Sequence, residues 1–128
     1  MEIIIDTNFL ITCAKQKIDL FSEIKEIFGN VKIIIPQQVI DELNKLKEDK
    51  KLKIKEREAA KISIDIINQQ VVFITDLKTP NVDAGIIRYA DKNNCVIATL
   101  DQKLKKSIKN PKTKFITIRD KKRIILQE

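Results

Sequence analysis

The chain has 128 residues, of which 43% are hydrophobic, and it carries a formal net charge of +7 with no histidine. This length suits a single domain spanning residues 1–128, and the hydrophobic content is too high for a disordered chain. The lack of histidine excludes histidine-based catalytic triads and histidine zinc ligands. Catalysis would therefore rest on carboxylates, lysines, hydroxyls or a metal ion held by oxygen atoms.

Other features of the composition indicate a cytoplasmic protein without membrane contact. No apolar run approaches the roughly 20 residues needed to cross a bilayer, and the acidic start at Glu2 and Asp6 is unlike a secretory signal. Cys13 and Cys95 lie far apart among apolar neighbours, which favours two buried thiols over a disulfide. The positive charge favours an acidic partner such as nucleic acid, although a lysine-rich composition alone gives the same charge.

Short apolar strands alternate with amphipathic helices along the chain. In chain order we expect a strand at 2–6, helices at 9–14 and 20–28, a strand at 31–35, helices at 37–46 and 56–67, a strand at 71–74, a helix at 82–91, a strand at 95–99, a helix at 102–108, a strand at 114–118 and a short extra strand at 123–126. Gly29 and Asn30 end the second helix, and Pro36 closes the second strand. The charged stretch from Lys45 to Lys61 alternates in sign, which is typical of a solvated helix end and loop.

This alternation predicts an α/β fold. Continuous apolar strands between amphipathic helices are typical of a parallel sheet that is covered by helices on both faces. We expect a central parallel sheet of about five strands. In open sheets of this kind, ligands bind beyond the carboxyl ends of the strands.

Four acidic residues lie close to the predicted strand ends. Asp6 follows the first strand, and Glu42 lies in the helix after the second strand. Asp83 begins the helix before the fourth strand, and Asp101 follows that strand. Taken singly, each aspartate is explained as a helix N-cap or first-turn acid, worth about 1 kcal/mol. Glu42 alone would be a solvated helix residue.

Helical phase separates these acids from their neighbours. At about 100° per residue, Glu42 falls on the edge of the apolar face of its helix, whereas Asp41 points to solvent. Asp83 falls in line with the apolar face that Ile86 and Ala90 define. Four carboxylates that share a pocket repel one another. A hard divalent cation, Mg²⁺ or Mn²⁺, removes this conflict because it prefers carboxylate oxygens and water.

Four stretches of the sequence resemble the motifs of the PIN-domain ribonucleases: IIIDTNFL, PQQVIDELNKL, NVDAGIIRYA and VIATLDQKLKK. The resemblance spans nearly the whole chain. VIATLDQKLKKSIKN, followed by KFITI, is similar to archaeal members akin to the branch that processes small-subunit ribosomal RNA. The resemblance implies a three-layer PIN-like fold with strand order 3-2-1-4-5.

The same resemblance implies a Mg²⁺- or Mn²⁺-dependent RNA endonuclease that cuts phosphodiester bonds with a metal-activated water. Val82 stands where many relatives carry a further acid, which leaves fewer ligands for a second ion, and the choice between one and two ions stays open. The implied catalytic and metal-binding residues are Asp6, Glu42, Asp83 and Asp101, and the implied supporting residues are Asn8 and Thr99.

The expected partner is single-stranded or structured RNA, with ribosomal-RNA processing as one role. Two alternatives stay open: the toxin ribonuclease of a toxin–antitoxin pair, and an RNA-binding ribosome-assembly factor with little catalysis. A homodimer stays open too, as does a protein partner, either an antitoxin or an assembly factor. A solvated basic face explains the candidate RNA-binding lysines equally well. These lysines are Lys103, Lys105, Lys106 and Lys109.

Overall fold

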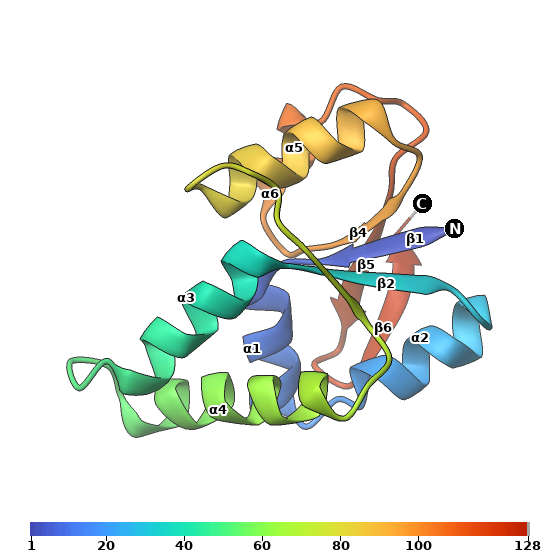
Figure 1. The fold of residues 1–128 in the computed structure, drawn as a ribbon. Coiled ribbons are helices and arrows are strands. Elements are labelled where there is room, and N and C mark those ends of the chain that lie inside the picture. The colour runs from blue at the N-terminus through green and yellow to red at the C-terminus, as the bar shows by residue number, and fades with distance from the viewer. Residues whose placement is uncertain (128) are drawn as a thin grey trace.

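The structure is a computed structural model and describes residues 1–127 (Figure 1). Its helices and strands are, in chain order, β1 (Glu2–Ile5), α1 (Thr7–Gln16), α2 (Leu20–Phe28), β2 (Lys32–Pro36), α3 (Gln37–Glu48), α4 (Ile54–Asn68), β3 (Phe73–Thr75), α5 (Val82–Lys92), β4 (Val96–Ala98), α6 (Gln102–Ser107), β5 (Lys114–Arg119) and β6 (Arg123–Gln127). Every predicted helix and strand is present, and each end lies within two residues of its predicted position.

The strands form one sheet in the order β3-β2-β1-β4-β5-β6. All neighbours pair in parallel except β5 and β6, which are antiparallel. The predicted order 3-2-1-4-5 is therefore confirmed, and the short extra strand extends the sheet beyond β5. Figure 1 shows α5 and α6 on one side of the sheet and α1, α2 and α4 on the other.

The central strands are buried, as their continuous apolar sequences predict. In β1, Ile3, Ile4 and Ile5 are fully buried because helices cover both faces of the sheet. Cys13 and Cys95 are buried free thiols, which confirms the prediction for both. Among residues 1–127, the structure contains no helix with the length and apolar character needed to span a bilayer.

The third strand lies at the edge of the sheet, where the predicted order 3-2-1-4-5 places it. β3 pairs only with β2. Phe73 and Ile74 are therefore 50% and 46% exposed, and Val71, just before the strand, is 91% exposed. An apolar run indicates a strand but does not say how many neighbours the strand has.

The ends of β1 and β4 lie side by side. Ile5 is in register with Ala98, and the Asp6 N–H donates to the Ala98 carbonyl oxygen over 3.0 Å. The chain then turns directly into α1 at Thr7. The segments that carry Asp6 and Asp101 therefore leave the sheet side by side, at the carboxyl ends of its two central strands.

The segment before α5 is fixed from two sides. Gln38 of α3 donates through its side-chain nitrogen to Asp76 Oδ1 and to the Thr79 carbonyl oxygen, over 2.8 and 2.9 Å. On the other side, α5 approaches the segment at Gly85. A Cβ atom on Gly85 would lie 2.8 Å from Leu77 Cβ, too close for a real contact. These contacts determine where α5 begins.

The Gly85→Ala substitution tests this close packing. Helix propensity alone predicts that alanine stabilises α5 by about 1 kcal/mol. Overpacking against Leu77 costs about 1–3 kcal/mol, so we expect the free energy of unfolding to fall by about 1 kcal/mol. Urea denaturation measures it, with Ala84→Ser at the exposed neighbouring position as the control. A Gly85→Ala protein more stable than wild type would show that the segment is not held against α5.

Candidate active site

The four acids singled out in the sequence line one pocket. This acidic pocket has a volume of about 440 Å³ and lies beyond the carboxyl ends of β1 and β4. Its acids come from four separate segments: the end of β1, α3, the first turn of α5 and the start of α6. The lining residues are Asp6, Asn8, Glu42, Pro80, Asn81, Val82, Asp83 and Asp101.

Asp6 is the most deeply placed of these acids, with only 5% of its surface exposed. Its Oδ1 accepts a hydrogen bond from the Thr7 N–H over 2.8 Å, and its Oδ2 accepts one from Thr99 Oγ1 over 3.0 Å. Asp6 is therefore the N-cap of α1, as predicted when each aspartate is considered singly. Capping does not require burial, however, and the same carboxylate also faces the pocket.

Thr99 connects two of the acids. Its fully buried hydroxyl donates to Asp6 Oδ2 and accepts from the Asp101 N–H over 3.1 Å. Asp101 in turn caps α6, because its Oδ1 accepts from the N–H groups of Lys103 and Leu104. Within residues 1–127, Asp101 Oδ2 has no hydrogen-bond partner. One oxygen of Asp101 thus holds the helix while the other can serve the pocket.

Asp83 and Glu42 lie at the rim of the pocket. Both are exposed, so helical phase overstates how far they lean towards the core. Asp83 is a first-turn acid of α5, whose N-cap is Asn81. Asp41 does not line the pocket, and its Oδ1 accepts a hydrogen bond from Gln37. The phase correctly separates the two neighbouring acids of α3, although both are solvated.

The environment of Asp6 opposes its negative charge. Burial raises the pKa of Asp6 to about 6, although the hydrogen bonds from Thr99 and Thr7 act in the opposite direction. The charges of Asp83 and Glu42 raise this pKa further. Burial also raises the pKa of Asp83 above its usual range, helped by the charge of Asp101. The acids therefore interact, as like charges in one pocket must.

The described residues offer this pocket no positive partner. None of the lining residues is Lys or Arg, and the two ion pairs found in residues 1–127, Lys15–Glu56 and Lys32–Glu2, do not involve these acids. Carboxylate oxygens in this number fit a hard cation such as Mg²⁺ or Mn²⁺. In the part of the chain that the structure describes, however, no three acids lie close enough to form a complete metal site. An ion would therefore need water, or side-chain movement, to complete its coordination.

Two residues that line the pocket were not singled out in the sequence, Pro80 and Asn81, whereas Val82 was noted there as the position of a further acid in many relatives. The sequence does indicate a role for Asn81, because asparagine directly before an apolar-periodic helix is a typical N-cap. In the structure, Asn81 caps α5 through its Oδ1. Asn8 lines the pocket but, within residues 1–127, makes no hydrogen bond to Asp6. The candidate RNA-binding lysines lie outside the acidic pocket, on α6 or just after it: Lys103, Lys105, Lys106 and Lys109.

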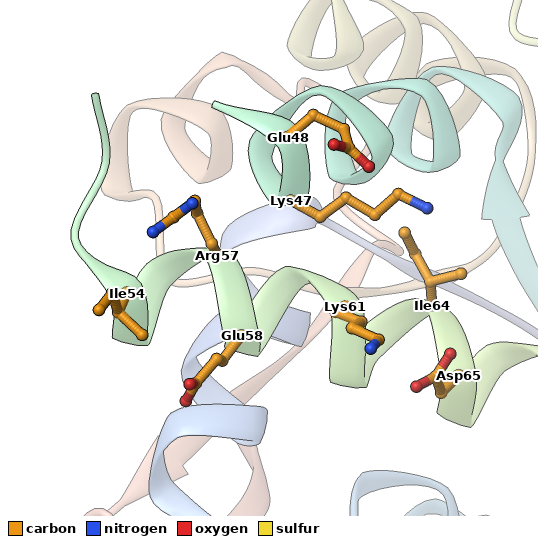
Figure 2. A pocket seen from close by; sticks show the side chains of 8 residues that line it. All are labelled: Lys47, Glu48, Ile54, Arg57, Glu58, Lys61, Ile64 and Asp65. Carbon is orange, nitrogen blue, oxygen red and sulfur yellow. The ribbon is translucent and has the colours of Figure 1, made fainter. Parts of the chain in front are cut away.

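A second hollow, between α3 and α4, has no such bias in charge. Figure 2 shows side chains from both helices around it. Three are basic and three are acidic, so their charges cancel, and none belongs to the predicted site. We therefore interpret this hollow as a solvated surface, in keeping with the solvated helix end and loop predicted for the charged stretch from Lys45 to Lys61.

The sequence matches the family described as "PIN like domain" over residues 3–121, and the chain belongs to this family. It is 32% identical over 124 residues to Ribonuclease VapC4 of Methanocaldococcus jannaschii, covering 94% of this chain and 92% of that protein. It is 27% identical to Ribonuclease VapC9 of Archaeoglobus fulgidus, covering 97% and 87%.

Solved structures show the same fold. The PIN domain endonuclease Utp24 superposes with a TM-score of 0.72 at 28% identity, covering 96% of this chain and 90% of that one. VapBC2 from Rickettsia felis, bound to a DNA fragment from its promoter, matches with a TM-score of 0.63 at 20% identity, covering 90% and 98%. The resemblance drawn from the four sequence motifs is thereby confirmed at the level of family and fold.

The raised pKa of Asp6 predicts a dependence of stability on pH in metal-free protein. The folded state favours neutral Asp6, so its contribution to stability is fully present below about pH 4 and is lost as the pH rises through about 6. Asp6→Asn does not titrate. Its free energy of unfolding, relative to wild type, should therefore rise between about pH 4 and pH 7 by on the order of 2–3 kcal/mol.

Urea denaturation in the presence of a chelator measures this difference. Asp41→Asn is the matched control, since it removes an exposed charge of α3 that does not line the pocket. A difference between Asp6→Asn and wild type that stayed constant over the same range would contradict the raised pKa.

Proposed function

We propose that the chain is a divalent-metal-dependent endoribonuclease. The observation that carries this proposal is the acidic pocket, which carboxylates from four segments line without a basic side chain. In the protein alone, the charges of these acids repel one another and destabilise the fold. A bound cation removes this repulsion and can also bind phosphate. The names of the relatives support the same activity, since two are ribonucleases and one solved structure is a PIN domain endonuclease.

Asp6, Asp83 and Asp101 would hold Mg²⁺ or Mn²⁺, directly or through water, and Glu42 would complete the site. A bound ion lowers the pKa of a coordinated water and stabilises charge on a phosphodiester under attack. Because Val82 supplies no ligand where many relatives carry an acid, few ligands remain for a second ion, and one ion is the simpler arrangement. Single-stranded or structured RNA is the proposed substrate, with ribosomal RNA proposed from the resemblance of the fourth motif.

The protein residues have separate roles in this proposal. Thr99 and the Thr7 N–H fix the orientation of the Asp6 carboxylate. The exposed Glu42 at the rim has the freedom to orient an attacking water and to accept its proton. Asp101 presents one oxygen to the pocket because α6 holds the other.

Cleavage of labelled RNA tests this function. We expect wild-type protein to cut with Mg²⁺ or Mn²⁺, to stop in a chelator, and to leave 5′-phosphate ends. Asp6→Asn, Asp83→Asn and Asp101→Asn should each lower the rate by at least about a hundredfold, because each would remove a ligand. Asp41→Asn should cut at the wild-type rate. If Asp83→Asn cut as fast as wild type, the proposed metal site would be wrong.

A second candidate function is a ribonuclease toxin controlled by a protein partner. The VapC names of the two relatives favour it, and so does an apolar pocket of about 510 Å³ among α1, α2 and α4. Ile62, on its border, is 43% exposed, as expected of a residue that a partner covers. The apolar residues lining this pocket include Leu10, Cys13, Ile18, Phe21, Ile62 and Ile66.

Growth of a bacterial host that expresses the chain tests this second function. A toxin should arrest growth, and the catalytically impaired Asp83→Asn should not. Growth unaffected by wild-type protein that cleaves RNA in vitro would favour an RNA-processing enzyme instead.

A further inference from the structure

A pocket of about 560 Å³ lies between α6, the start of β5 and the end of β6. We call it the basic pocket, because Lys105, Lys106 and Lys114 line it and no acidic side chain does. Lys106 and Lys114 are exposed, whereas Lys105 is partly buried. The charge is the opposite of that in the acidic pocket, and so an anion is the expected occupant.

Lys105 is the member of this group that most needs an anion. Its ammonium donates to Gln127 Oε1 over 2.7 Å and lies 5.8 Å from the centre of the Phe115 ring. Neither partner carries a negative charge, and within residues 1–127 Lys105 forms no ion pair. Burial also lowers the pKa of Lys105 below its usual range. A partly desolvated ammonium with three donors and one neutral acceptor can bind an anion strongly.

Thr113 supplies a second and independent observation. It lines the basic pocket, and its Oγ1 is buried without a hydrogen-bond partner in the part of the chain that the structure describes. A buried hydroxyl without a partner is costly and calls for an explanation. A small movement of this side chain towards an anion in the pocket would give the hydroxyl an acceptor for its proton.

The basic pocket lies next to the acidic pocket along α6. Asp101 caps the helix at the acidic pocket, and Lys105 lies four residues further on, about 6 Å along the helix axis. We propose that the basic pocket binds a phosphate group of the RNA strand a short distance from the bond that is cut. This inference rests on the proposed function, because it takes the acidic pocket as the place of cleavage.

A binding site in this pocket differs in a measurable way from a diffuse basic surface. Lys112 lies two residues before Lys114, is also exposed, and does not line the pocket. A diffuse surface would respond similarly to the loss of either charge. A phosphate site would respond mainly to the loss of Lys114. The substitutions Lys114→Gln and Lys112→Gln therefore form a matched pair.

Fluorescence anisotropy with a short labelled oligouridine, in a chelator that prevents cleavage, measures binding. We expect Lys114→Gln to weaken binding on the order of tenfold. It should also reduce the slope of log affinity against log salt by about 0.7, the value for one phosphate contact with a single strand. Lys112→Gln should change both quantities by less than half as much. Equal effects of the two variants would overturn the proposal.

Thr113→Val tests the pocket without changing any charge. Valine has a similar shape and removes the unpartnered hydroxyl, so the unliganded protein should melt at the same temperature or higher. We expect its affinity for oligouridine to fall severalfold nonetheless. A variant that is at least as stable as wild type and binds RNA equally well would show that the hydroxyl meets no ligand.

Further ligands separate a strand phosphate from other anions. Inorganic phosphate in millimolar excess should compete weakly with oligouridine for wild type, and less for Lys114→Gln. Polyglutamate of similar length should not compete at matched ionic strength. Competition by polyglutamate equal to that by unlabelled oligouridine would overturn the assignment to RNA. The assignment would also be overturned if wild type bound inorganic phosphate while Lys114→Gln and Thr113→Val both bound RNA as tightly as wild type.

The outcome of this test is separate from that of the cleavage assay. If wild type bound oligouridine through Lys114 and Thr113 but never cut RNA, the result would support the phosphate site in the basic pocket and contradict the proposed endoribonuclease. If wild type cut RNA and both pocket variants bound and cut RNA normally, the result would support the endoribonuclease and contradict the phosphate site.

Discussion

The carboxyl group of Asp6 is buried where β1 and β4 end side by side, and the nearest charges are also negative. Hydrogen bonds from Thr7 and Thr99 hold it there but do not cancel the cost of burying its charge, as the raised pKa of Asp6 shows. The parallel sheet imposes this arrangement, because the chain leaves neighbouring strands at the same edge. A cation in the pocket would turn the unfavourable arrangement into a favourable one.

The rest of the fold arranges groups around this point. Gln38 and the close approach at Gly85 fix the segment that leads to Asp83. Thr99 ties Asp6 to the start of α6, and that helix leads from the acidic pocket to the basic pocket. With a cation bound on one side and lysines on the other, the surface would favour one placement of a polyanionic strand. The opposite charges of the two pockets thus suit both cutting and positioning.

Much of this arrangement could be predicted from the sequence. The apolar strands and amphipathic helices follow from periodicity, and the strand order follows from the resemblance of the four motifs. The convergence of Asp6 and Asp101 follows from parallel strands, whose carboxyl ends meet at one edge. The sequence did not decide whether Asp6 and Asp101 are helix N-caps or pocket residues. One carboxylate can cap a helix and also line a pocket, and both residues do so.

The remaining features depend on contacts between distant segments. The exposure of Phe73 follows from the edge position of β3, which its own sequence does not encode. Helical phase shows which face carries Asp83 but not whether another element covers that face. The role of Gln38 appears only when α3 meets the segment before α5. These are tertiary effects, and local patterns of residues are insensitive to them.

Diffraction from crystals soaked in Mn²⁺ and measured at the manganese absorption edge tests the central claim most directly. We expect an anomalous peak in the acidic pocket, with at least two of Asp6, Asp83 and Asp101 within coordination distance or joined to the ion by one water. Acids that stay apart around an empty pocket, at a Mn²⁺ concentration that supports RNA cleavage, would contradict the claim that their shared charge is a cation site.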